Sequence, residues 1–312
     1  MPLKKTSIRR GLQWILILIL LLSCWLWWRT GSIEVVLDQE SLKIHPVTDG
    51  PVTFSIMTYN VQARPWFDDS KHTFHYLSPL LNKYDICAVQ ECFKDHNRLW
   101  NEAEHPVKIY HATLKHPLKV VGSGLSILGK YPLEKTTGIN FAHQGDKQNL
   151  PASKGVLMAR FKIQDMLLDV YTTHIAAGKH TASLEARIAQ GNEIIQFIQT
   201  NSPPENAVIL LGDFNMRPSR GTKDKEANKD NPRVYGFDRI VDALKLRDAS
   251  DEINGPIGKE IDRILFRPGK NQTLQPLDWE HDAPEFYDPD GKALSDHEPV
   301  IVNFKLTKEP TG

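Results

Sequence analysis

Residues 208–215 read Val208-Ile209-Leu210-Leu211-Gly212-Asp213-Phe214-Asn215, and the rest of the chain is best interpreted around them. Four consecutive bulky apolar residues are typical of a β-strand that is buried on both faces. Asp213 and Asn215 follow at a spacing of two, so their side chains would leave the strand end on the same side. Gly212 permits the close approach of another backbone or of a phosphate. An isolated Asp-x-Asn is more commonly an Asx turn, so the interpretation depends on the partners found elsewhere.

Polar side chains also mark the ends of several other predicted strands. Helices are predicted between them, over 72–83, 93–104 and 181–200, and this irregular alternation indicates an α/β fold. We expect two sheets packed face to face with helices outside and a site at one rim. The strand-end residues are Asn60 at the end of 52–60, Glu91 after 85–90, His174 after 167–173, Asp262 at the start of 261–266, and Asp296-His297 before 300–304.

Glu91 and Asn60 are candidate ligands for a hard divalent cation. Mg²⁺ prefers one or two carboxylates together with water and phosphate oxygens, so one Glu with amide support suffices. Asp213 would hold or activate a water molecule, and Asn215 would bind a phosphate oxygen. A lone acid at a strand end is more commonly just solvated, so this prediction requires that these residues meet in space.

His297 is the candidate general base. Asp262 could orient its second ring nitrogen, which is the arrangement needed to deprotonate water. His174 is a second candidate, for binding or protonating phosphate oxygens, although a His before the turn-forming residues 176–178 can also be purely structural. Together with the metal ligands, these residues indicate metal-assisted hydrolysis of a phosphodiester.

Other reaction classes lack their sequence signatures. The chain has no Gly-x-Ser-x-Gly elbow and no Gly-rich phosphate loop followed by Lys-Ser/Thr. Its three cysteines, Cys24, Cys87 and Cys92, form no disulfide framework or zinc spacing. The nucleophile is therefore predicted to be water.

The charge distribution argues against generic DNA binding. The chain has 38 basic and 38 acidic residues. Five of the basic residues lie in residues 1–30, which contain no acid, so residues 31–312 carry 33 basic and 38 acidic side chains. Non-specific binding to DNA depends on Lys and Arg, and a mildly acidic domain matches it poorly unless it has a local basic groove.

The N-terminus has the composition of a membrane-targeting segment. Basic residues precede the apolar run Leu12–Trp28, and Arg29 follows it. No small-x-small cleavage site follows, and Trp25, Trp27 and Trp28 resemble an interfacial belt. Of three alternatives we favour an uncleaved anchor, which would place residues 30–312 on the non-cytoplasmic side. A cleaved signal, which would release a secreted protein, is the second choice, and a lipoprotein signal at Cys24 is the third.

The ordered set of polar segments resembles the endonuclease/exonuclease/phosphatase superfamily, which has the deoxyribonuclease I-like fold. The resemblance implies a four-layer α/β sandwich and a Mg²⁺-dependent phosphoesterase, with Mn²⁺ or Co²⁺ as substitutes. The domain would span 52–308, after the N-terminal segment 1–30 and a linker or edge strand at 31–51. The segments are Asn60, Gln90-Glu91, His174, Gly212-Asp213-Phe214-Asn215, Ile261-Asp262-Arg263 and Ser295-Asp296-His297.

The same resemblance implies roles on the phosphate side of the site. Glu91 would be the metal ligand, and Asn60 would support the metal or the phosphate. Asn215 would bind phosphate, and His174 would stabilise the pentacovalent phosphorane.

On the water side, the resemblance makes His297 the base. Asp213 would position the water or His297, and Asp262 would orient a His. Asp296 would lie beside the metal or a His.

Within the superfamily, two segments are similar to the neutral and bacterial sphingomyelinase C branch. One is Ala152–Arg160, where Lys154-Gly155 precedes the strand leading toward His174. The other is the aromatic loop Trp279–Tyr287, which lies where secreted sphingomyelinases carry a membrane-contacting hairpin, although here it is rich in acids. By this resemblance, Lys154, Trp279 and Phe286 would bind substrate.

Three functions remain open. The first is a sphingomyelinase C-like phosphodiesterase that acts at a phospholipid membrane and releases phosphocholine. The second is a secreted or anchored nuclease of the same fold, and the third is an inositol-phosphate or other phosphatase, or a non-catalytic binding module. We expect a monomer without an obligate protein partner.

Overall fold

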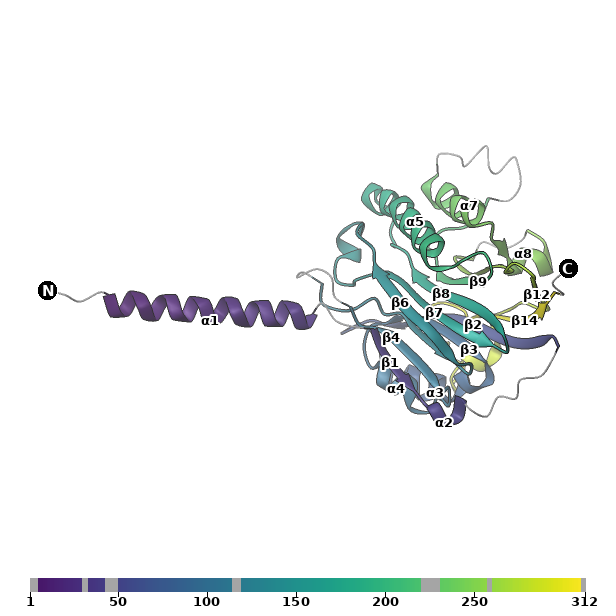
Figure 1. The fold of residues 1–312 in the computed structure, drawn as a ribbon, viewed down its shortest axis with the longest axis horizontal. Helices are drawn as coiled ribbons and strands as arrows, with labels where there is room; N and C mark the ends of the chain where they lie inside the picture. The colour runs from purple at the N-terminus through teal and green to yellow at the C-terminus, as the bar shows by residue number, and fades with distance from the viewer. Residues whose placement is uncertain are drawn as a thin grey trace.

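The computed structural model describes residues 5–29, 33–42, 50–113, 119–219, 231–256 and 260–309. Two mixed β-sheets pack face to face, and helices cover their outer faces (Figure 1). The eight-stranded sheet has the order β1 (Ile33–Leu37), β4 (Val107–His111), β5 (Ser126–Gly129), β3 (Ile86–Cys92), β2 (Val52–Ala63), β14 (Val300–Lys308) and β12 (Gln272–Pro276), with β13 (Glu280–His281) paired to β14. The six-stranded sheet has the order β10 (Arg247–Asp248), β11 (Asp262–Arg267), β9 (Ala207–Asp213), β8 (Met166–His174), β7 (Gly155–Ile163) and β6 (Leu133–Asn140).

Helices form the two outer layers. Figure 1 shows α5, α7 and α8 on the side of the six-stranded sheet, α3 and α4 on the opposite side, and α1 projecting from the body. The helices are α1 (Lys5–Arg29), α2 (Gln39–Leu42), α3 (Ser70–Leu80), α4 (His96–Asn101), α5 (Thr181–Asn201), α7 (Pro232–Leu244) and α8 (Ala249–Asn254), with 3-10 turns η1 (Leu81–Lys83), η2 (Lys147–Asn149) and η3 (Pro284–Phe286).

The apolar core has three parts, one for each interface between layers. In β9, Ile209 and Leu211 belong to the cluster between the sheets, whereas Val208 and Leu210 belong to the cluster under α5 and α7. This alternation follows from the two-residue period of a strand, and it needs apolar residues at every position. The prediction of a strand buried on both faces is confirmed, as is the four-layer α/β sandwich.

Some elements differ from those predicted. The segment between the strands near 124–128 and 155–163 contains the additional strand β6, which pairs with β7 at the edge of its sheet. The predicted helix over 93–104 shortens to α4, which begins after Asp95 in a left-handed conformation. At the N-terminus, the described apolar side chains of α1 are exposed. None of the helices in the described ranges combines the length and apolar character of a membrane span; Trp27 and Trp28 have side chains outside the described residues.

Gly212 is required by the backbone of the central strand. Its φ is +134°, and a Cβ at this position would lie 2.1 Å from the carbonyl oxygen of Thr173. Both sheets pack around this point, so neither backbone can shift to make room. Gly212→Ala should therefore lower the free energy of unfolding by about 3 kcal/mol or more. Urea denaturation measures this change, and a loss below about 1 kcal/mol would contradict the packing described.

Candidate active site

Strand pairing brings the predicted polar residues to one rim. In the parallel pair β8–β9, His174 lies opposite Asp213, and in the antiparallel pair β9–β11, Asp213 lies opposite Asp262. In the other sheet, the parallel pair β2–β3 places Asn60 opposite Gln90, next to Glu91. The two sheets thus converge on one cluster.

Asn60 links the two sheets at the centre of this cluster. Its Nδ2 donates to Asp213 Oδ2 at 3.2 Å and to Glu91 Oε1 at 3.3 Å, and lies 3.4 Å from His297 Nε2. The side chain of Asn60 is buried. A single amide therefore fixes the relative positions of the predicted metal ligand, the predicted water-positioning carboxylate and the predicted base.

His297 is held by a carboxylate on its far side. Its Nδ1 lies 2.7 Å from Asp262 Oδ2, and its Nε2 lies 4.0 Å from Asp213 Oδ2. Burial alone would lower the pKa of His297, but the hydrogen bond and charge of Asp262, with the charges of Asp213 and Asp296, raise it to about 9. Ring nitrogen Nε2 thus faces the cluster while Nδ1 is fixed, which is the geometry of an oriented base.

The loop before β14 fixes the backbone of His297. The Ser295 hydroxyl donates to the Asn60 carbonyl at 2.6 Å and accepts from the His297 N–H at 3.2 Å. The Asp296 N–H donates to Gln62 Oε1 at 3.1 Å. Asp296 itself is exposed and lines a small pocket with His297. These bonds explain how a loop residue reaches a rim that is otherwise built from strand ends.

Lys154 and His174 form a buried pair on the opposite side of the cluster. Lys154 Nζ lies 2.7 Å from His174 Nε2 and donates to the Ile175 carbonyl at 3.0 Å. Burial holds the pKa of His174 well below its usual value, and burial lowers the pKa of Lys154 to about 8 even though Glu91 and Asp213 favour its charge. The ammonium of Lys154 therefore donates to a neutral His174, and Lys154 carries the positive charge.

Asn215 is used within the protein. Its backbone N–H donates to Asp213 Oδ1 at 2.8 Å, and its Nδ2 donates to Asp213 Oδ2 at 3.1 Å and to the Ile175 carbonyl at 3.2 Å. The left-handed backbone of Asn215, with φ of +47°, makes this turn possible. In this geometry Asn215 positions Asp213, and its contact with phosphate stays a prediction.

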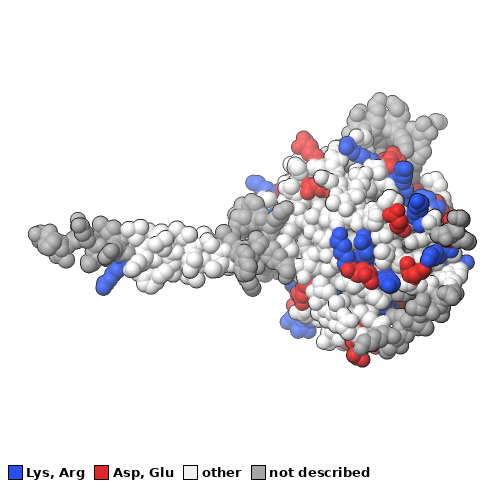
Figure 2. Space-filling model, viewed as in Figure 1, with Lys and Arg blue, Asp and Glu red and all other residues white. Residues whose placement is uncertain are grey.

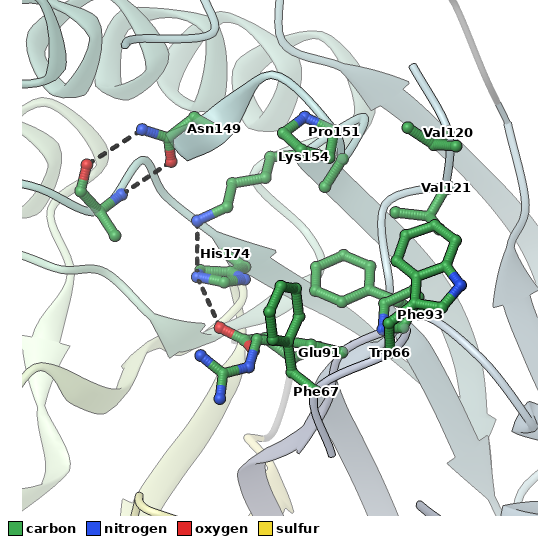
Figure 3. Close-up of a pocket in the computed structure, with 14 residues that line it drawn as sticks. Trp66, Phe67, Glu91, Phe93, Val120, Val121, Asn149, Pro151, Lys154 and His174 are labelled. Carbon is green, nitrogen blue, oxygen red and sulfur yellow. Dashed lines mark hydrogen bonds and ion pairs between the residues drawn. The ribbon is translucent and has the colours of Figure 1, made fainter. Parts of the chain in front are cut away.

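A pocket of about 280 Å³ opens beside Glu91 and His174. Figure 3 shows the chain of contacts from Lys154 through His174 to Glu91 on one side, the rings of Phe93 and Trp66 toward Val120 and Val121 on the other, and the ring of Phe67 between them. The pocket is therefore lined by buried polar side chains, Lys154 and His174, and by exposed apolar ones, Trp66, Phe67 and Val120. Sequence reasoning assigned no role to Trp66 and Phe67, although an aromatic pair in a predicted loop is a recognisable signal.

Phe286 is not placed to contact a membrane. It is 2% exposed, packs edge to face on Tyr59 with centroids 5.1 Å apart, and stacks on Tyr84 at 6.3 Å. Its ring forms the back wall of the small pocket near His297. Its ring belongs to the core cluster between the sheet and α3, and its contact with substrate stays a prediction.

Trp279 also differs from the expectation of a membrane-contacting loop. It is half-buried against the core between the sheets, and its ring stacks on His281 at 5.4 Å. Strand β13 ties this segment to β14, with Glu280 opposite Ile301. Trp279 is therefore held against the body of the domain.

The core position of Phe286 gives a stability prediction. Phe286→Ala should lower the free energy of unfolding by about 3 kcal/mol, because it removes a fully packed ring and leaves a cavity. Chemical denaturation of the purified variant measures this. The matched change Tyr287→Ala removes a neighbouring ring that is 39% exposed, and it should cost less than about 1 kcal/mol. Equal losses would contradict the assignment of Phe286 to the core.

Asp262 gives a prediction about pH. A base must be neutral to accept a proton, so the rate should rise as pH rises through the pKa of His297. Asp262→Asn removes the carboxylate that raises this pKa, so the acid limb of kcat/KM should move to lower pH by about one unit or more, with a lower maximal rate. The pH profiles of both proteins test this, and a limb that stays in place or moves to higher pH would refute the coupling.

Known proteins resemble this chain in sequence. A sequence profile of the endonuclease/exonuclease/phosphatase family matches residues 57–297. The chain belongs to this family. A sphingomyelinase of Mycobacterium bovis is 29% identical over 274 residues, which cover 80% of this chain and 52% of that protein. The chain thus spans about half the length of these curated relatives.

Solved structures of this family share the fold. Humanized D. rerio TDP2 matches with a TM-score of 0.60 and 18% identity, over 81% of this chain and 98% of that one. A beta toxin mutant from Staphylococcus aureus with bound magnesium ions matches with a TM-score of 0.58 and 17% identity, over 83% of this chain and 100% of that one. At these identities the likeness concerns the fold.

Proposed function

We propose that the protein is a divalent-metal-dependent phosphodiesterase of sphingomyelinase C type, which cleaves phosphocholine from a phospholipid. The observation that carries this proposal is the lining of the pocket beside Glu91 and His174. Its lining combines the buried side chains of Lys154 and His174 and the largely buried Glu91 with exposed apolar side chains, Trp66, Phe67 and Val120, and Arg64 also lines it. A phosphodiester with an apolar leaving group fits this distribution better than a nucleic acid does.

The cluster fits a divalent cation by its chemistry. Burial raises the pKa of the carboxyl groups of Glu91, Asp213 and Asp262, which shows a concentration of buried negative charge that a cation would stabilise. Glu91 offers the hard carboxylate oxygen that Mg²⁺ prefers. Asn60 turns its Nδ2 toward Glu91 and its Oδ1 toward the Gln62 N–H, so in this geometry it supports Glu91, and its own contact with the cation stays a prediction. When bound there, the cation would neutralise charge on the phosphate oxygens.

A second group of ligand-type atoms has a different explanation. Asp213, Asp262 and His297 each offer an atom within 4.8 Å of the others. The 2.7 Å contact between His297 and Asp262 is a hydrogen bond that orients the ring. We therefore assign these residues to the base and its support, and we assign the cation to Glu91.

The reaction follows from the position of His297. Its Nε2 accepts a proton from a water molecule that Asp213 helps to hold. The water oxygen forms a bond to phosphorus as the bond from phosphorus to the lipid alkoxide oxygen breaks, and the alkoxide takes a proton from solvent. Lys154, which contacts His174, places a positive charge beside the phosphate. The lipid part then leaves on the side away from His297.

Surface charge favours the lipid over a nucleic acid. On the face in Figure 2, the Lys and Arg side chains are interspersed with Asp and Glu, and they do not form one basic stripe. Duplex binding generally requires such a stripe. We also propose that the apolar N-terminal segment keeps the domain close to a lipid layer, which the exposed apolar side chains of α1 between Leu12 and Trp25 support. The basic residues before the apolar run support a position of the domain on the non-cytoplasmic side.

A substrate comparison tests the proposed function. The full chain is assayed with Mg²⁺ on sphingomyelin vesicles, phosphatidylcholine vesicles and plasmid DNA in parallel, with an equal sample in chelator. We expect phosphocholine from sphingomyelin that disappears in chelator. Nicking of the plasmid without lipid turnover would assign the protein to the nucleases of the family. Turnover of neither, by a folded protein, would refute the proposed substrate class.

A further inference from the structure

The loop between β2 and α3 displays two large aromatic side chains. Trp66 is 80% exposed and Phe67 is 82% exposed. Burying an aromatic ring is favourable, so leaving two adjacent rings in water forgoes a substantial gain. Trp66 also has a left-handed backbone, with φ of +68°, which is rare and unfavourable for an aromatic residue.

The base of this loop is closed by a specific set of bonds. Arg64 Nε donates to Asp68 Oδ2 at 2.7 Å, and Arg64 Nη2 donates to Asp68 Oδ1 at 3.0 Å. The Arg64 backbone N–H donates to the same carboxylate at 2.9 Å, and Lys94 Nζ donates to the Asp68 carbonyl at 2.8 Å. A bidentate pair of this kind fixes geometry as well as charge. The loop therefore holds both rings outward.

The exposed rings of Trp66 and Phe67 line the pocket beside Glu91 and His174, and a second segment of the chain lines it next to them. Val120, which is 55% exposed, and Val121 line the pocket with Trp66 and Phe67 (Figure 3). The Val120 N–H donates to the Pro151 carbonyl at 2.8 Å, so two loops are joined there. We call Trp66, Phe67, Val120 and Val121 the apolar rim.

We propose that the apolar rim docks into the interfacial layer of a phosphatidylcholine–sphingomyelin bilayer and so brings the pocket over a substrate molecule. This inference rests on the proposed function, and it names the surface through which that function reaches its substrate. A lipid is the expected partner of the apolar rim, because the rim residues line the same pocket as Glu91 and His174. A lipid that enters headgroup first would leave its acyl chains against the rim.

Charge near the rim agrees with this occupant. Arg64 lines the pocket together with Trp66 and Phe67, and Lys94 Nζ donates to the Asp68 carbonyl of the same loop. Aromatic rings beside Lys side chains are typical of surfaces that sit at the headgroup level, where rings enter the apolar boundary and ammonium groups meet phosphates. The predicted contact segment Trp279–Tyr287 lacks this character, since Trp279 and Phe286 pack on the body.

A fluorescent label locates the surface that enters the lipid. In the full chain, Cys24→Ser removes the exposed cysteine, and Cys87 and Cys92 do not react because they are buried. Phe67→Cys, labelled with the environment-sensitive dye NBD, is mixed with sphingomyelin–phosphatidylcholine vesicles in chelator. The matched control is Leu277→Cys, an exposed apolar position near the rival segment.

We expect the fluorescence at position 67 to rise by about twofold or more and to be quenched by lipids with doxyl groups on their acyl chains, with little change at position 277. A response at 277 without one at 67 would show that the other segment docks. No response at either position would show that the rim does not enter lipid. Each of these two results overturns the proposal, and neither depends on hydrolysis.

Enzyme rates give a second test. Trp66→Ala/Phe67→Ala should lower the rate on vesicles relative to the rate on the soluble ester bis(p-nitrophenyl) phosphate by at least about tenfold, because binding energy from the rim is lost only with vesicles. Leu277→Ala should leave this ratio unchanged. An unchanged ratio in the double variant would refute docking through the rim. If the unaltered chain hydrolyses neither substrate, the proposed function fails, while the label still reports on docking.

Discussion

His297→Ala should lower kcat on a phosphodiester by about a thousandfold, because it removes the group that accepts the proton of the attacking water. The ring contacts Asp262 at 2.7 Å on one side and lies 3.4 Å from Asn60 on the other. Its loss leaves the metal ligand and the pocket in place, so substrate binding should change little. Steady-state kinetics with vesicles and with a soluble diester measure the change.

His281→Ala is the matched control for this variant. His281 also pairs with a carboxylate, Glu298, at 2.8 Å, but it lies on β13 outside the cluster. The control should keep kcat within about twofold, because a surface ion pair contributes little. A folded His297→Ala protein with unchanged kcat would exclude His297 as the base.

Removal of the cation should abolish turnover, and Glu91→Gln should raise the Mg²⁺ concentration needed for half-maximal rate by at least about tenfold. Glu91 is the one carboxylate of the described cluster that lies on the eight-stranded sheet, and its pKa is raised by burial. Replacing it by an amide removes the charge that attracts the cation. Mg²⁺ titration of activity and calorimetry of Mg²⁺ binding both measure this.

Glu134→Gln, on the edge strand β6, is the control for charge alone. Its side chain is exposed, so its loss should leave the Mg²⁺ titration unchanged. An unchanged titration in Glu91→Gln as well would exclude Glu91 as a ligand. A shifted titration for Asp262→Asn but not for Glu91→Gln would place the cation near His297 instead.

The residues at strand ends could be predicted from the sequence because each follows or precedes an apolar run. Asp213 comes after four apolar residues, and Glu91 and His174 end similar segments. A strand that is buried on both faces has apolar residues at consecutive positions, so a polar residue at the end of such a run lies at the rim of the sheet. That these rims coincide depends on strand order, which the resemblance implied and the pairing of β8, β9 and β11 confirms.

The sequence could not predict in this way which aromatic residues are buried and which are exposed. Phe67 and Phe286 both lie in polar segments of the sequence, yet one is 82% exposed and the other 2%. Their burial depends on long-range contacts, such as that of Phe286 with Tyr59. Strand β6 was missed for a related reason, since an edge strand with one paired neighbour tolerates polar residues such as Lys135 and Thr137.

Hydrolysis of sphingomyelin in ¹⁸O-labelled water, with Mg²⁺ present, tests most directly whether this cluster drives attack of water on phosphorus. Mass spectrometry of the products follows the label. We predict phosphocholine with one ¹⁸O in its phosphate and an unlabelled lipid alcohol, formed about a thousandfold more slowly by His297→Ala. Label in the lipid alcohol, or no phosphocholine from the unaltered protein, would contradict the account.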